Sequence, residues 1–199
     1  MRLRRHAGYQ LVEMLIAFSV SSLLLVLGIP PLMKITARLR VDLAAAEIAS
    51  TLRIARAFAV RHSMHVGLKF RVHEDGVVTW ALYRDADGDG VLTADIDSGV
   101  DPEVLPQQRL AHFGASVHLG FPPGKAPRDP GNPRRRLDRL DDPIRFNRSD
   151  IASFSHLGVS TPGSVYVTDG NHFLSAVRVF AATGKVTKLA YDVVSESWR

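Results

Sequence analysis

Cysteine is absent from this chain of 199 residues, and its absence excludes several classes of protein at once. Without a thiol there is no disulfide framework, no thiolate zinc site and no cysteine nucleophile. Other enzyme signatures are missing too. The eight histidines form no HExxH pair, and no Gly-x-Ser-x-Gly elbow or phosphate-binding glycine loop occurs. We therefore expect a protein that is not an enzyme and has no cofactor.

The composition is that of a folded protein whose positive charge is unevenly distributed. Apolar residues make up 46% and charged residues 23% of the chain, which is enough for a packed core. The formal net charge is +5, but three arginines fall within the first five residues, and without them 22 basic face 20 acidic side chains. The charge is thus partly an end effect and gives only weak support for nucleic-acid binding.

A long apolar run occupies the first part of the chain. Residues 9–33 carry a single charge, on Glu13, and about 20 apolar residues are enough to span a bilayer as a helix. The short basic flank before the run favours a cytoplasmic N terminus, with the rest of the chain outside. An ordinary cleaved secretory signal is disfavoured because its apolar run would be about 7–15 residues long. A plain membrane anchor is a further alternative.

The residues around Glu13 suggest a more specific interpretation. A lone carboxylate in a membrane helix costs about 2–3 kcal/mol and normally has a partner. The pattern Gly8-Tyr9-Gln10-Leu11-Val12-Glu13, between a basic leader and an apolar run, resembles the class III signal of type IV pilins and pseudopilins. The resemblance implies that prepilin peptidase removes residues 1–8 after Gly8 and methylates the new amino terminus on Tyr9. It also implies that Glu13 pairs with the amino terminus of a neighbouring subunit.

The same resemblance implies a location and a shape. Residues 9–33 would form a transmembrane and assembly helix in the inner membrane, with the N terminus cytoplasmic and the head periplasmic before the subunit joins a filament. A helical pattern without glycine or proline continues over 34–63, the amphipathic helix of the head. Its apolar residues step by four and predict one packed stripe: Ile35, Leu39 and Leu43, then Ile48 and Leu52, then Ile54 and Phe58. One helix from Tyr9 to His62 is therefore expected.

Beyond Ser63 the apolar period changes from helical to alternating, which predicts strands. We expect a hairpin turn at Asp75-Gly76 and strands at 65–72, 77–84, 117–121, 144–146, 164–168, 176–180 and 186–191. The predicted fold class is α+β. A long N-terminal helix, with a membrane half and an amphipathic half, packs on an antiparallel β-rich head of residues 64–199.

Three further segments resemble the GspH/FimT family of minor pseudopilins. Leu52-Arg53-Ile54-Ala55-Arg56 is similar to the helix motif of that family, and Phe154-Ser-His-Leu-Gly158 and Gly184-Lys-Val186 are similar to its C-terminal pattern. The resemblance covers about 1–72 and 143–192, and residues 73–142 have no counterpart in it. It implies a structural minor subunit of a type II secretion pseudopilus or a type IV pilus, whose partners are other such subunits.

DNA binding is the alternative function that this resemblance supplies. Some FimT-like minor pilins act in DNA uptake during natural transformation and carry a basic motif near the C terminus. The candidate DNA-binding residues are Arg178, Lys185 and Lys188, which we expect on one face of a hairpin.

Two charged segments remain. Asp85-Ala-Asp-Gly-Asp-Gly90 matches the first half of a calcium loop, but position twelve is Ile96 instead of a glutamate and a strand precedes the loop. A solvated acidic connection is favoured and no metal site is predicted, with calcium at Asp85, Asp87 and Asp89 left open. The second segment holds arginines at 128, 134–136 and 139 among five prolines, which predict a mobile loop more readily than a phosphate-binding patch.

Overall fold

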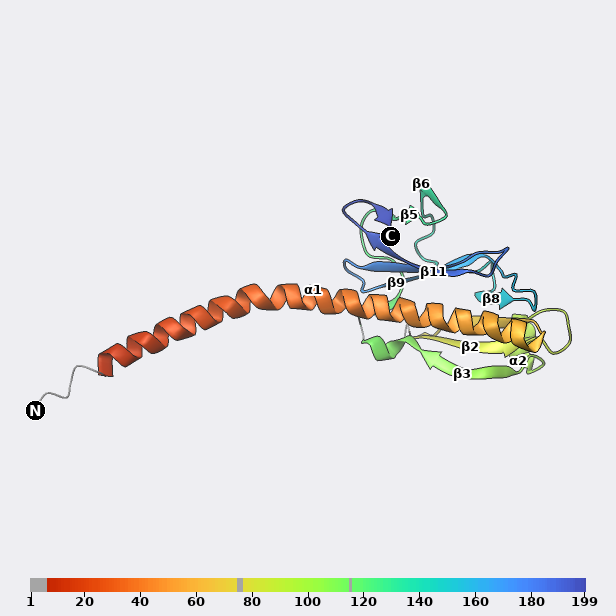
Figure 1. Cartoon of the computed structure of the whole chain (residues 1–199), viewed down its shortest axis with the longest axis horizontal. Coiled ribbons are helices and arrows are strands. Elements are labelled where there is room, and N and C mark those ends of the chain that lie inside the picture. The colour runs from red at the N-terminus through yellow and green to blue at the C-terminus, as the bar shows by residue number, and fades with distance from the viewer. Residues whose placement is uncertain (1–6, 75–76, 115) are drawn as a thin grey trace, which may run out of the picture. The chain divides into compact units, whose positions relative to one another are not determined.

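The computed structural model describes residues 7–74, 77–114 and 116–199. Leader residues 1–6 and the predicted turn at Asp75-Gly76 lie outside the described residues. The chain forms two compact units, Met1–Arg38 and Leu39–Arg199. Helix α1, Ala7–His62, belongs to both, and it confirms the single long helix expected from Tyr9 to His62 (Figure 1).

The first unit is helical over its described part and leaves its apolar side chains exposed. Phe18 is 69% exposed and Leu24 66%, and Pro30 and Pro31 lie inside the helix. A window of 18 residues in α1 is apolar and long enough to cross a membrane, and none of it is buried in the molecule. This part of α1 therefore has the surface of a segment whose contacts come from outside the chain.

In the second unit α1 buries a stripe of mostly small side chains. The buried positions follow the helical period of 3.6 residues, and they are Val41, Ala44, Ala45, Ile48, Ala49, Leu52, Ala55 and Ala59. Alanine lacks bulk beyond Cβ, so the helix lies close to the strands it covers.

The predicted stripe is correct at Ile48 and Leu52, wrong at Ile54, which is 50% exposed, and wrong at its beginning. Leu39 and Leu43 are 54% and 56% exposed, as is Ile35 at 55% in the first unit. Five residues separate Leu43 from Ile48, and five residues turn an α-helix by about 140°. The first trio therefore lies on a different face from the residues that pack.

Two larger antiparallel sheets make up most of the rest of the head. The first has the order β3-β2-β1-β8, formed by Glu103–Arg109, Val78–Arg84, Val66–Val72 and Ile151–Phe154. The second has the order β12-β11-β10-β9-β4, with β7 also paired to β9. Its strands, in that order, are Ser197–Trp198, Val186–Asp192, Leu174–Val179, Gly163–Thr168, His118–Leu119 and, for β7, Ile144–Arg145.

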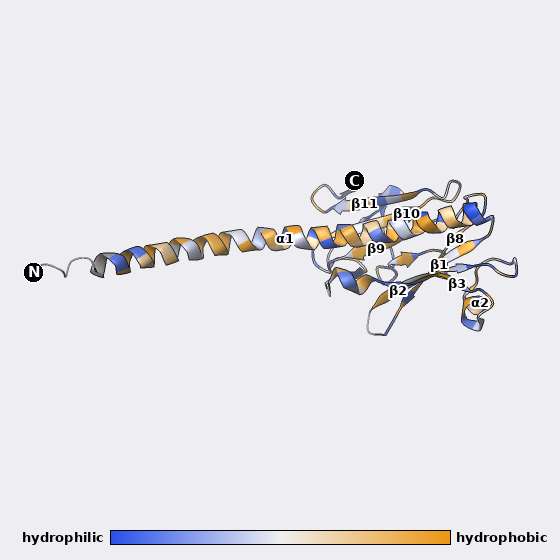
Figure 2. Ribbon diagram, turned by 60° about the horizontal axis from the view of Figure 1, so that its bottom comes forward, coloured by the Kyte–Doolittle hydropathy of each residue, from blue (hydrophilic) through white to orange (hydrophobic). Residues whose placement is uncertain are grey.

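One hydrophobic core joins the helix to both sheets. The α1 stripe packs with Phe70 and Trp80 of the first sheet and with Val165 and Val177 of the second. Figure 2 shows the apolar residues that run along this part of α1 and along the strands beside it. The predicted α+β fold is confirmed, since the head is built from antiparallel strands around the second half of the helix.

All seven predicted strands are present, and the elements that were not predicted are short or lie at sheet edges. Edge strand β3 contains Pro106 and is irregular in its pairing with β2. The proline-rich segment forms a hairpin instead of the expected mobile loop. A two-stranded ribbon has edges on both sides, where proline is tolerated. The other new elements are β5 (Arg128–Asp129), β6 (Asn132–Arg136), β8, β12, α2 (Thr93–Ser98) and the 3₁₀ helix η1 (Leu110–Phe113).

Candidate functional site

The predicted processing and assembly residues lie together at the start of α1. Gly8 and Tyr9 belong to its first turn, and Glu13 follows five residues after Gly8. The Glu13 side chain is exposed among apolar neighbours. Within residues 7–74, 77–114 and 116–199, no ion pair or hydrogen bond reaches its carboxylate. The carboxylate is thus free for a group from another molecule, while cleavage, methylation and pairing stay predictions.

The helix motif and the C-terminal glycines meet at one junction in the head. Arg53 Nη2 donates a hydrogen bond to the carbonyl oxygen of Val186 at 3.3 Å. A Cβ on Gly184 would lie 2.8 Å from Arg56 Nε and would overlap the carbonyl oxygen of Gly158. Both glycines have positive φ, +57° and +77°. The guanidinium of Arg56 therefore occupies space that only glycine at these two turns leaves open.

The candidate DNA-binding residues do not share one face. The register of β10 with β11 pairs Arg178 with Thr187 and Val177 with Lys188. Paired residues point to the same side of a sheet, so Thr187 shares the side of Arg178. Lys188 is the next residue on its strand and therefore points to the opposite side. The prediction of a single basic face is wrong for this pair.

Each of these basic side chains has a different environment. Lys188 forms an ion pair with Asp42 of α1. Arg178 donates to the carbonyl oxygen of Pro130 at 2.7 Å and lies 4.6 Å from the centroid of the Phe180 ring. Lys185 is exposed in the turn between the strands. Two of the three cations are therefore engaged within the head itself.

The acidic segment forms a compact loop. Carboxylate oxygens of Asp85, Asp87 and Asp89 lie within 4.8 Å of one another, and Asp85 accepts hydrogen bonds from the backbone of Gly88 and Gly90. Buried Asp101 accepts from the N–H groups of Ala86 and Leu92, which holds the two sides of the loop together.

One carboxylate oxygen of the helix α2, which follows this loop, lacks a hydrogen-bond partner in the described part of the chain. Asp95 Oδ2 is buried without a hydrogen bond among the described residues. Partial burial and then the charges of Asp87, Asp101 and Asp85 raise the pKa of Asp95. Clustered carboxylate oxygens are the donors that Ca²⁺ prefers, so calcium stays an alternative to the solvated loop favoured from the sequence.

Residues 121–142, here called the strap, cover the outer face of the second sheet. Leu137 of the strap is buried with Tyr166, Leu174 and Ala176, and Phe121, Tyr191 and Trp198 pack around them. Burial raises the pKa of the Tyr166 hydroxyl to about 12. The strap comes from the segment without a counterpart in the resembled family, and it gives the head a second small core.

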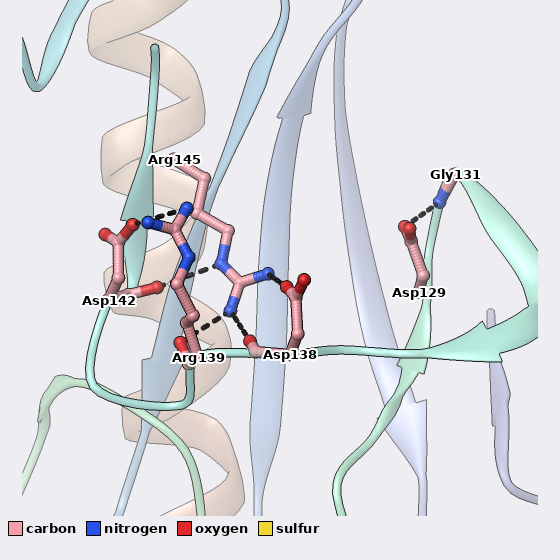
Figure 3. A network of polar contacts seen from close by, with 6 residues as sticks. All are labelled: Asp129, Gly131, Asp138, Arg139, Asp142 and Arg145. Carbon is pink, nitrogen blue, oxygen red and sulfur yellow. Dashed lines mark hydrogen bonds and ion pairs between the residues drawn. The ribbon is translucent and has the colours of Figure 1, made fainter. Parts of the chain in front are cut away.

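Arg145 and Glu196 hold the strap through hydrogen bonds and ion pairs near its two ends. Arg145 donates to the carbonyl oxygens of Asp142 and Arg139 at 2.9 and 2.8 Å, and its Nη1 lies 3.4 Å from Asp138 Oδ1 (Figure 3). Its guanidinium also lies 5.5 and 5.6 Å from the ring centroids of Phe121 and Tyr166. Glu196 accepts from Lys125 and Arg136 at 2.7 and 2.6 Å, and these bonds lower its pKa to about 2.

Neither of these two anchors was a candidate in the sequence. Glu196 belongs to no motif, and its three cations, at 125, 128 and 136, lie far from it along the chain. Arg145 offered a signal, since it stands between two apolar residues of a predicted strand, where a cation needs a partner. The identity of that partner depends on tertiary structure.

Comparisons with known proteins give a weak structural likeness and no match in sequence. No protein-family model matches the chain, and no curated protein matches it. The chain is similar to a solved structure, the minor pseudopilin EpsH from the Type 2 Secretion System of Vibrio cholerae. That match has 11% identity and a TM-score of 0.44, and it covers 76% of this chain and 97% of that chain. The likeness is too distant to transfer a property of EpsH to this chain.

Proposed function

We propose that this protein is a minor pseudopilin, a structural and non-catalytic subunit of a type II secretion pseudopilus or a type IV pilus. Prepilin peptidase cuts it after Gly8 and methylates Tyr9. One observation carries the proposal. Gly8, Tyr9 and Glu13 have the spacing of the pilin signal and lie at the start of α1. The N-terminal part of this helix is apolar and exposed, and its C-terminal part is packed into a β-rich head.

The two halves of α1 fit both the membrane-inserted state and the assembled state of such a subunit. Before assembly, the exposed apolar half lies in the inner membrane with the N terminus cytoplasmic and the head periplasmic. During assembly, that half leaves the bilayer and packs among the helices of other subunits. Such a transfer keeps the apolar surface out of water at every stage.

Glu13 sets the register of this packing. Its carboxylate has no partner in the described chain, and a positive amino terminus of a neighbouring subunit would relieve its desolvation. Glu13→Val should therefore still be cleaved, while its incorporation into filaments falls about tenfold or more, which corresponds to about 1.4 kcal/mol of lost interaction. Sheared filaments and membranes are compared by immunoblot in a host that carries the assembly machine.

Glu47→Val is the matched control because it removes a carboxylate from the head half of the same helix, where Glu47 contacts His112. Normal incorporation of the Glu47 variant together with loss of the Glu13 variant supports the pairing role. Normal incorporation of the Glu13 variant refutes that role.

The DNA-receptor alternative finds less support in the geometry. Lys188 is paired with Asp42, and Arg178 faces the opposite side of the sheet. A groove for a phosphate backbone needs several free cations on one surface. The structural subunit is therefore the function that these residues support best.

A further inference from the structure

The turn between β11 and β12 carries two apolar side chains that the head does not cover. Val193 is 57% exposed and Val194 is 96% exposed. The turn is nevertheless held in one conformation, because Asp192 Oδ1 accepts hydrogen bonds from the N–H groups of Val194 and Ser195 at 3.0 and 3.3 Å. Valine is stiff and β-branched, whereas turns favour Gly, Asn, Asp and Ser. The local fold therefore gives no reason for two valines at this turn.

Contacts with α1 show at which end of the head this turn lies. The carbonyl oxygen of Val186, at the start of β11, accepts from Arg53, and Lys188 forms an ion pair with Asp42. Strand β11 therefore runs antiparallel to the helix, toward Leu39, where the second unit begins. We call this the entry end of the head. Figure 1 shows the dark blue turn after β11 at this end.

The turn reaches at least as far as the residue at which α1 enters the head. Asp42 is about 5 Å along the helix from Leu39, at a rise of about 1.5 Å per residue. From Lys188, strand β11 continues to Asp192, which is about 13 Å at about 3.3 Å per residue. The two valines follow Asp192 and therefore lie at or beyond the level of Leu39.

A short stretch of α1 keeps the entry end close to the lipid in the membrane-inserted state. The apolar run ends at Met33, and Leu39 follows six positions later, which corresponds to about 9 Å of helix. The headgroup region on each side of the hydrocarbon core is about 5–8 Å thick. An apolar turn that projects from the entry end is thus within reach of this region.

The charges on this stretch of α1 suit lipid headgroups. Lys34, Arg38 and Arg40 are exposed, and in the part of the chain that the structure describes none of them forms an ion pair. No carboxylate occurs in the sequence between Glu13 and Asp42. Basic residues beside a membrane helix are attracted to anionic headgroups. The charge of the entry end therefore favours a lipid surface as its partner.

The turn itself brings no unpaired negative charge toward the lipid. Asp192 is paired with Arg199 at 2.7 Å, and Glu196 is paired with Lys125 at 2.7 Å. The two valines lie between these carboxylates in the sequence. Apolar area can therefore leave water at this turn without the burial of an isolated charge, which is what favours a segment at a membrane surface.

We propose that the β11–β12 turn contacts the lipid surface, with Val193 and Val194 inserted among the headgroups of the bilayer that holds the apolar part of α1. The contact rests on the membrane-inserted state of the proposed function and adds a second point of attachment to it. Two points of attachment hold the head in one orientation on the membrane before assembly. Extraction of the subunit then removes the turn from the lipid together with α1.

The absence of cysteine permits a direct test with single labels. Ser195→Cys places a thiol on the exposed turn beside both valines, and Thr183→Cys places one on the exposed turn at the opposite end of β11. Each full-length variant is labelled with acrylodan and reconstituted in nanodiscs of phosphatidylethanolamine and phosphatidylglycerol. Lipids with a nitroxide near the headgroup act as quenchers. The Thr183 variant is the matched control, since its label reports how often the other end of the head meets the lipid.

We expect the label at position 195 to be quenched about threefold more strongly than the label at position 183, because the headgroup region is only about 5–8 Å thick. Val193→Ser with Val194→Ser should lower the quenching at position 195 to the level of position 183, since the turn then has no apolar side chain to insert. Equal quenching at the two positions overturns the proposal. Quenching that the serine changes leave unaltered also overturns it, because the short connection to α1 would then be its cause.

Two further readouts test the charge and the occupant. Nanodiscs of neutral phosphatidylcholine should lower the quenching at position 195, and unchanged quenching overturns the assignment of the three cations to headgroups. A second copy of the chain is the other candidate occupant of the turn. If the emission of the label at position 195 shifts to the blue as the protein concentration rises in detergent, while quenching in nanodiscs stays at control level, the turn binds another copy and the lipid contact is overturned.

The same samples keep this proposal distinct from the proposed function. A chain that co-elutes with nanodiscs but shows equal quenching at both positions keeps the membrane-inserted state and loses the contact. A chain that does not co-elute with them removes that state, and the contact with it. The intact mass after co-expression with prepilin peptidase is read separately. An uncleaved chain with strong quenching at position 195 removes the pilin pathway and supports the contact.

Discussion

In the first unit α1 leaves large apolar side chains exposed, and Leu24 and Val26 are 66% and 69% accessible. In the second unit the same helix buries Ala44, Ala45 and Ala49 completely. The head therefore covers its own apolar surface with its own strands, whereas the first unit needs lipid or other helices to cover it. The two parts of α1 thus differ in their apolar side chains, which are large and exposed in the first unit and mostly small and buried in the second.

Truncation of an apolar side chain should cost much more stability in the second unit than in the first. Ile48→Ala removes a fully buried side chain and should lower the free energy of unfolding of the head by about 2–5 kcal/mol. Leu25→Ala makes the same kind of change at a position that is 60% exposed, where a loss below about 0.5 kcal/mol is expected. Denaturant unfolding in mild detergent, followed by tryptophan fluorescence, measures both. Equal losses would contradict the division into two environments.

The junction between helix and sheet should be sensitive to a single methyl group. Gly184→Ala places a Cβ against the Gly158 carbonyl oxygen and Arg56 Nε at a φ of +57°, and we expect a loss of about 2–3 kcal/mol. Gly88→Ala is the control, since its φ is +94° and a Cβ there meets nothing within 4 Å. It should carry only the backbone cost of about 1 kcal/mol. Thermal unfolding compares the two, and a larger effect at Gly88 would refute the junction.

A smaller effect is expected inside the head, between its main core and the strap. Lys125 and Arg136 lower the pKa of Glu196 from its usual 4.5 to about 2. A carboxylate whose pKa is lowered by folding contributes stability that is complete above its unfolded pKa. That contribution is lost as the pH falls from about 5 toward 2. Acid should therefore loosen the strap before the main core.

Trp198 reports on this loosening because its Nε1 donates to the strap backbone at Arg128. Fluorescence of the Trp80→Phe variant, which keeps only Trp198, should change between about pH 5 and pH 2. Glu196→Gln removes the titrating group and should abolish that change. An unaltered transition in the Glu196 variant would show that other groups hold the strap.

The sequence was sufficient for features that repeat locally. The long helix and the alternating strands were predicted because the spacing of apolar residues within each segment indicates its secondary structure. The phase of the stripe failed at Leu39 and Leu43, since a spacing of four does not fix which face meets the sheets. Strand β3 was not expected because Pro106 and exposed polar residues hide an edge strand.

The candidate site shows the same limit. Gly8, Tyr9 and Glu13 could be proposed from the sequence because the proposed processing and pairing depend on spacing along one segment. The face of Lys188 depended on the register of β10 with β11, and that register is set by the turn between them. The anchoring roles of Arg145 and Glu196 needed the tertiary structure, since their partners come from distant parts of the chain.

The central claim is that this chain enters the pilin pathway through its N terminus. Its most direct test is the intact mass of the full-length chain after co-expression with an active prepilin peptidase, with Gly8→Leu as the uncleaved control. The proposal predicts a chain that begins at Tyr9 and carries one methyl group. An intact Met1 terminus, under a peptidase that processes a known substrate in the same cells, would contradict it.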